Sequence, residues 1–168
     1  YNGRAYIGVS GTGQFTPYSG HNITVIDLTG WRIAYSVPTQ GYPQTSGLLT
    51  TAYGAADGTV YVYFFDNYTP GKLRVLKDAP GQTRAELTTE ESYTVKGVTN
   101  TYTTPYVLFT PADAQAQYAI CSPITDSYGT LYFKNDSAHL MALSSTIESL
   151  TFSKQPDKTS YKAGEVFD

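Results

Sequence analysis

Apolar and polar residues alternate along several short stretches of the chain, and a period of two residues predicts β-strands. The clearest stretch is 60–65, where Val60, Val62 and Phe64 interleave with larger aromatic residues. Similar short patterns predict strands at residues 4–9, 23–26, 31–37, 73–76, 106–109 and 139–143. No window of twelve residues keeps the 3.6-residue period of a helix. The pattern therefore predicts an all-β fold.

One short motif, Gly-x-x-Tyr at the start of a strand, occurs three times and gives Tyr6, Tyr61 and Tyr132 equivalent positions. Each copy continues through a polar loop into a second apolar strand, at residues 22–27, 72–77 and 138–143. A repeated meander of antiparallel strands is typical of a β-propeller. We therefore expect about three antiparallel β-meander blades of a partial β-propeller.

The three copies are spaced more widely than compact blades. The interval is 55 residues from Gly3 to Gly58 and 71 residues from Gly58 to Gly129, against roughly 40 to 50 for compact blades. The second interval contains residues 98–110, which we interpret as an inserted hairpin or an elaborated outer strand. Repeat folds tolerate such insertions because they fall on loops.

The third copy, residues 125–143 (TDSYGTLYFKNDSAHLMAL), resembles the repeat of quinoprotein-dehydrogenase-like, or PQQ-type, β-propellers. The match covers the strand-loop-strand core of all three copies with decreasing clarity. It looks most like the divergent repeat of large surface proteins of gut-type Gram-positive bacteria. The resemblance implies a fold, but it does not imply redox chemistry. The quinone cofactor of the true dehydrogenases requires a complete ring of blades and calcium ligands on its axis, so we expect no cofactor.

Residues 146–168 are similar to the opening strands of bacterial Ig-like domains. The matching positions are Gln155-Pro156, residues 158–161, Gly164 and Phe167-Asp168. These residues are too few for a sandwich of about seven strands. The expected organisation is propeller blades at 1–145, then a linker and the first strands of a truncated Ig-like domain at 146–168. The chain is thus expected to be a piece of a larger protein.

Charge and hydropathy narrow the range of partners. The chain has 11 Lys and Arg against 14 Asp and Glu, with a formal net charge of -3, and the two signs are mixed along the sequence. Nucleic acid is not an expected partner, because phosphate binding needs concentrated positive charge. No run approaches the roughly 18 apolar residues of a membrane span. Sixteen tyrosines are consistent with half-buried sheet surfaces.

The residues with catalytic chemistry do not form a recognisable motif. His21 and His139 have no second His or Cys at metal-ligand spacing, and no G-x-S-x-G sequence is present. Each histidine is expected to be solvated or packed against a blade, and Cys121 is expected to be a small buried apolar residue. Asp126 and Asp136 bracket a turn, so we expect them to cap it. We assign no catalytic residue and no metal ligand.

Tyrosines outside the repeat are the remaining functional candidates. They stand beside Pro, Gly or Thr, where an exposed ring can stack on a sugar or anchor a peptide. The alternative for each is packing between sheets with a solvated hydroxyl group. The candidate binding residues are Tyr18, Tyr42, Tyr68, Tyr102 and Tyr106.

Together these features favour a non-enzymatic binding or adhesion scaffold, extracellular and on the bacterial cell surface. Its expected partners are the remaining blades of the same protein or another chain, with a glycan or a host protein as ligand. Two alternatives stay open. One is a fragment of a propeller enzyme, polysaccharide-active or redox, whose site lies in other blades, and the other is a purely structural spacer.

Overall fold

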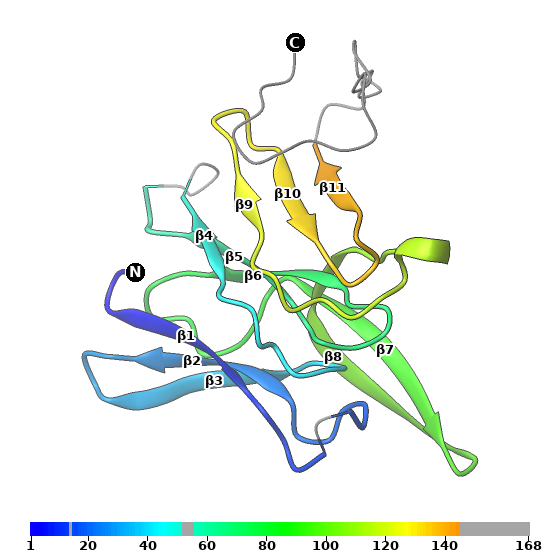
Figure 1. Ribbon diagram of the computed structural model, residues 1–168. Coiled ribbons are helices and arrows are strands. Elements are labelled where there is room, and N and C mark those ends of the chain that lie inside the picture. Colours follow the sequence, from blue (N-terminus) through cyan, green and yellow to red (C-terminus); the bar gives the residue numbers. More distant parts are fainter. Residues whose placement is uncertain (14, 52–55, 145–168) are drawn as a thin grey trace, which may run out of the picture.

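A computed structural model of the 168-residue chain describes residues 1–13, 15–51 and 56–144. Within these ranges the chain forms eleven strands and one short 3₁₀ turn, η1 (Asp113–Gln115). All strand pairs are antiparallel and form three successive sheets (Figure 1). The prediction of an all-β fold is confirmed.

The first and third sheets are meanders, and the second is larger. The first sheet contains β1 (Arg4–Val9), β2 (Asn22–Asp27) and β3 (Arg32–Pro38). The third contains β9 (Ile124–Thr125), β10 (Leu131–Lys134) and β11 (Leu140–Leu143). The second has the order β4-β5-β6-β8-β7, with β4 (Leu48–Thr50), β5 (Val60–Phe65), β6 (Leu73–Asp78), β7 (Thr88–Val95) and β8 (Val98–Phe109).

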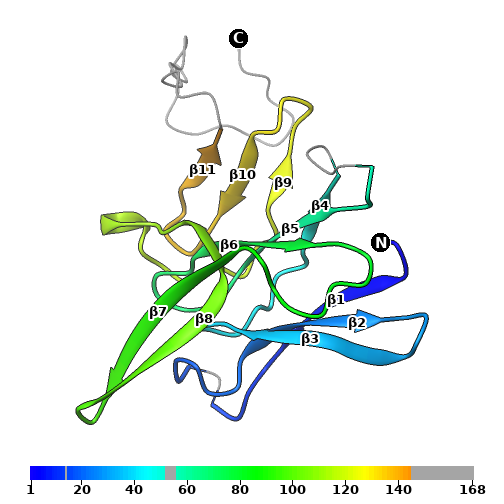
Figure 2. The same cartoon turned by 180° about the vertical axis from the view of Figure 1, so that it is seen from behind.

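The second sheet lies between the other two, as Figures 1 and 2 show from opposite sides, and its strands β5 and β6 are buried on both faces. Strand β5 explains this arrangement, because its alternating side chains are apolar or aromatic on both sides. Val60, Val62 and Phe64 pack toward the first sheet. Phe65 packs toward the third sheet, where its ring centroid lies 5.1 Å from that of Phe133.

A buried carboxylate ties the first sheet to the second. Asp78, at the end of β6, is fully buried. Its oxygens accept hydrogen bonds from Arg4 Nε (2.6 Å) and Nη2 (3.0 Å), from the Tyr6 hydroxyl (2.8 Å) and from the Tyr35 hydroxyl (2.6 Å). All three donor residues belong to the first sheet. The charge is therefore satisfied only when the two sheets are docked.

The three copies of the sequence motif have matching local geometry. Gly3, Gly58 and Gly129 have positive φ angles of 69°, 82° and 84°, a conformation that costs glycine little. The strand pairs β1–β2, β5–β6 and β10–β11 follow the three copies as the motif predicts. Within the described residues the three sheets remain separate and do not close into a ring.

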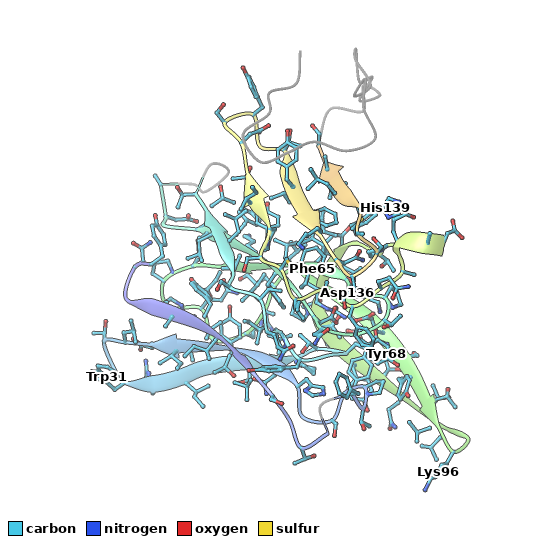
Figure 3. All side chains as sticks on the ribbon, viewed as in Figure 1. Trp31, Phe65, Tyr68, Lys96, Asp136 and His139 are labelled. Atoms are coloured by element: carbon cyan, nitrogen blue, oxygen red, sulfur yellow. The ribbon has the colours of Figure 1, made fainter. Side chains whose placement is uncertain are left out.

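Strands β7 and β8 form a long hairpin that projects beyond the sheets (Figure 1). Lys96 and Gly97 make its two-residue turn with φ angles of 48° and 78°, and Figure 3 shows Lys96 at the tip. The hairpin pairs with the rest of the sheet through β8 and β6. The predicted insertion at 98–110 is thus the second arm of a hairpin whose first arm is β7. The expected Ig-like start at 146–168 lies outside the described residues.

The two-sided burial of β5 generates a stability prediction. We expect Phe65→Ala to lower the free energy of unfolding by about 3 to 5 kcal/mol, because it opens a cavity between the second and third sheets. Tyr128→Ala is the matched control, since this ring is 89% exposed and should change stability by less than about 0.5 kcal/mol. Urea unfolding followed by circular dichroism measures both. Equal stabilities for the two variants would contradict the packing of the third sheet on β5.

Candidate functional site

The candidate site is built around a buried charge near the start of β6. The side chain of Arg74 is fully buried. Its Nε and Nη2 atoms lie 2.9 Å and 2.8 Å from Asp66 Oδ2, and Nη2 lies 2.7 Å from Glu91 Oε2. Asp66 begins the loop after β5, and Glu91 lies on β7. The buried guanidinium therefore holds both a loop and the hairpin in place.

Further polar groups complete this cluster. Arg74 Nη1 donates to Thr104 Oγ1 (3.0 Å), and Thr104 Oγ1 donates to Glu91 Oε2 (2.9 Å). The ammonium group of Lys72 pairs with Glu91 Oε1. Burial by itself would raise the pKa of Glu91, but the positive charges of Arg74 and Lys72 and their hydrogen bonds outweigh it and lower the pKa to about 2. Glu91 is consequently ionised at neutral pH.

Glu91 also positions the first of a group of aromatic rings. The hydroxyl group of Tyr18, in the loop between β1 and β2, lies near the Glu91 carboxylate. Burial raises the pKa of Tyr18 and the charge of Glu91 raises it further, so the phenol stays protonated. The ring of Tyr18 stacks on Tyr102 of β8, with centroids 3.9 Å apart and planes at 3°. The ring centroid of Tyr93, on β7, lies 5.9 Å from that of Tyr18.

The aromatic group continues across the neighbouring loops. Tyr68, in the loop between β5 and β6, lies close to Tyr93 and Tyr118. Tyr118 makes an edge-to-face contact with Phe15, with centroids 6.1 Å apart. We call this set the aromatic belt; it consists of Phe15, Tyr18, Tyr68, Tyr93, Tyr102 and Tyr118.

Loop ends of all three sheets meet beside the belt and border a shallow, open hollow of about 430 Å³. Figure 3 shows Tyr68 and Asp136 at this end of the molecule, whereas Trp31 lies at the far tip of the first sheet. The hollow combines apolar, amide and carboxylate side chains. Its lining residues are Phe15, Gln44, Asn67, Tyr118, Ile120 and Asp136.

The structure brings together three of the five tyrosines predicted from the sequence, namely Tyr18, Tyr68 and Tyr102. Tyr42 packs instead beside His21, with ring centroids 6.4 Å apart. Tyr106 is 39% exposed and lies on β8 opposite β6. Tyr102 and Tyr106 both lie on β8, within the segment 98–110 that the sequence predicts to be a hairpin or an outer strand. Their Thr- and Tyr-rich surroundings favour a strand, and the neighbouring arm β7 supplies its hydrogen-bond partners.

Sequence reasoning missed Phe15, Tyr93 and Tyr118. For Tyr93 a signal was present in the two-residue Lys96-Gly97 turn. Such a turn sets the register of the hairpin, which places Glu91 opposite Tyr102 and Tyr93 two residues further on the same face. Phe15 and Tyr118 are brought together by the packing of distant loops, for which the sequence carries no local signal.

The two histidines and the cysteine considered for catalysis do not belong to the aromatic belt. His21 is 1% exposed; its Nδ1 accepts from Gly11 N (3.1 Å) and its Nε2 donates to the Gly13 carbonyl (2.9 Å), which is a packing role. His139 is exposed. Cys121 is half-buried, so the expectation of full burial is wrong: its segment crosses the surface between η1 and β9.

Asp126 lies in the turn before β10 and Asp136 in the turn after it, and the sequence predicts that both residues cap a turn. Asp126 Oδ1 accepts from Tyr128 N (2.9 Å) and Thr130 N (3.0 Å), so its capping role is confirmed. At the second turn, Asn135 accepts from Ser137 N (3.1 Å), and the exposed Asp136 is a lining residue of the hollow.

Comparisons with known proteins, and searches of the described residues for metal sites and membrane-spanning helices, assign no function to the chain. No protein-family model and no curated protein matches the chain. In residues 1–13, 15–51 and 56–144, no group of three or more His, Cys, Asp or Glu side chains is placed to hold a metal ion. The same described ranges contain no helix long and apolar enough to cross a membrane.

The low pKa of Glu91 generates a pH prediction. Since the pKa falls from 4.5 to about 2 on folding, the carboxylate contributes stability above pH 4.5 that is lost as the pH falls toward 2. We expect Glu91→Gln to lower the free energy of unfolding by about 2 to 3 kcal/mol near neutral pH, and by much less near about pH 2.5. Urea unfolding of both proteins across this range measures the difference. A difference that does not change with pH would show that Glu91 is not ionised by its neighbours.

Proposed function

We propose that this chain is a non-catalytic binding or adhesion module of a secreted or cell-surface bacterial protein, and that the aromatic belt forms its ligand surface. The observation that carries the proposal is the convergence of six aromatic rings on loop ends and a hairpin held by one buried ion cluster. Tyrosine offers a large contact area, a polar hydroxyl group and few rotatable bonds, which suits recognition surfaces.

The placement of the belt supports a binding role. Loops on a rigid β-scaffold commonly carry recognition residues, because they vary without disturbing the core. Here Tyr18 and Tyr68 are loop residues, and Tyr93 and Tyr102 project from the hairpin. The ion cluster beneath them limits their freedom, so a ligand would meet a largely preformed surface and lose less entropy on binding.

A non-catalytic role is favoured by what the reactive side chains do. Both ring nitrogens of His21 are engaged by backbone groups, and His139 bonds to its neighbour Ser137. Neither belongs to the lining of the hollow. The cell-surface location rests on the sequence resemblance to repeats of bacterial surface proteins.

We also propose that the three sheets are blades of a propeller. Support comes from the repeated strand pairs and from the exposed apolar residues on the outer faces of the end sheets. On the first sheet, Ile7 is 44% and Val9 36% exposed, opposite the face that packs on β5. On the third, Ile124 and Leu140 are 65% and 76% exposed. The occupant that fits each face is another three-stranded sheet of the same repeat, since the internal sheets already pack in this way.

The belt proposal predicts a loss of binding in a specific variant. We expect the intact chain to bind a ligand from arrays of glycans and of host extracellular proteins. Tyr18→Ala combined with Tyr102→Ala should weaken that binding by at least about tenfold, because both rings of the stack are removed. Tyr106→Ala, outside the belt, is the matched control. Undiminished binding by the double variant, with circular dichroism unchanged, would place the ligand elsewhere.

The blade proposal predicts self-association through the outer faces. In the isolated chain these faces can only pair with another copy, so light scattering should detect concentration-dependent oligomers. Ile7→Lys combined with Leu140→Lys should make the chain monomeric, because a charge would be buried in each interface. Val95→Lys, at the exposed hairpin tip, should have no effect. A wild-type chain that is monomeric at all concentrations would contradict the docking of further sheets.

A further inference from the structure

The hollow beside the belt is formed by segments from all three sheets. Phe15 comes from the β1–β2 loop, Gln44 from the β3–β4 connection and Asn67 from the β5–β6 loop. Tyr118 precedes β9, and Asp136 lies in the turn between β10 and β11. A hollow of about 430 Å³ at such a junction falls within the size range of small-ligand sites.

One part of the lining is apolar and more exposed than folding alone requires. Phe15 is 61% exposed, Ile120 is 55% exposed and Tyr118 is 37% exposed. The Phe15 and Tyr118 rings meet edge to face, so at least one face of each ring is not covered by the other. These side chains offer an apolar ring surface to a ligand in the hollow.

The polar part of the lining is rich in acceptors. Asn67 is only 8% exposed, and its Oδ1 atom has no hydrogen-bond partner among the residues that the structure describes, although Nδ2 donates to Gln44 Oε1 at 2.6 Å. An unpartnered buried acceptor is unfavourable and is relieved by a donor. Asp136 adds a carboxylate, and no Lys or Arg is among the residues that line the hollow.

These two parts together define the chemistry of a matching ligand. It must present an apolar face to aromatic rings and hydrogen-bond donors to amide and carboxylate oxygens, and it must carry no negative charge that would face Asp136. A neutral sugar ring has this combination, since its C–H groups form an apolar face and its hydroxyl groups donate around the edge. We propose that the hollow binds one or two units of a neutral oligosaccharide. This inference rests on the proposed binding function.

The first experiment identifies the ligand class. The intact chain is screened on an array of neutral, sialylated and sulfated oligosaccharides, and the strongest neutral binder is then titrated by calorimetry. We expect neutral glycans to bind and acidic ones to bind less well. During the titration, the side-chain amide signals of Asn67 should shift in ¹H–¹⁵N spectra, because this residue lines the hollow and a bound ligand changes its surroundings.

Variants then test the location. Phe15→Ala should weaken binding of that glycan about tenfold, and Asp136→Ala about three- to tenfold. Both residues are exposed, so neither change should affect folding, which urea unfolding checks. Tyr128→Ala is the control, because this ring is 89% exposed and is not among the residues that line the hollow. The affinity of this variant for the glycan should stay within about twofold of the wild-type affinity.

The outcomes separate this inference from the proposed function. Glycan binding that survives Phe15→Ala but is lost in the Tyr18 and Tyr102 double variant would overturn the hollow as the site and leave the belt function standing. Preference for acidic glycans, or binding only to a protein through the belt, would overturn the neutral-saccharide assignment alone. A chain that binds nothing on either array would overturn both proposals.

Discussion

A single buried guanidinium organises the end of the molecule that carries the candidate site. Arg74 is fully buried in β6, where an unpaired positive charge would cost several kcal/mol. Its partners come from two separate segments: Asp66 from the loop after β5 and Glu91 from the hairpin. The hydroxyl group of Tyr18, in a loop of the first sheet, lies near Glu91. The placement of the hairpin that carries Tyr93 and Tyr102, beside Tyr18, therefore follows from the need to pair this one charge.

The same physical rule operates at the other end of the interface between the first two sheets. Asp78 is a buried carboxylate whose donors, Arg4, Tyr6 and Tyr35, all belong to the first sheet. Apolar packing around β5 supplies most of the docking surface, but it is not directional. The buried charges add direction, because their hydrogen bonds form in one relative placement of the sheets. A rigid scaffold results, on which loops can hold a ligand surface.

The alternation of apolar and polar residues predicted the strands well, because this alternation is visible within short stretches of the sequence. Strands β2 and β5 have the bounds that the alternation and the repeat predict. The candidate site was predicted only in part, since Tyr18, Tyr68 and Tyr102 were chosen from their local surroundings. Arg74 within an apolar strand was a sign of a buried charge that needs partners. Nothing local, however, indicates that its partners are eight and seventeen residues away on a loop and a hairpin.

The central claim is that the buried ion cluster holds the aromatic belt in place, and the Tyr18–Tyr102 stack reports on it directly. Stacked rings shift each other's aromatic proton resonances, so these two tyrosines should have strongly displaced signals in the wild-type chain. In Glu91→Gln, where Tyr18 loses its charged neighbour and Arg74 keeps only Asp66 as a charged partner, the signals should move toward those of free tyrosine while the resonances of the β5 core stay unchanged. Ring signals that are identical in the two proteins would contradict the claim.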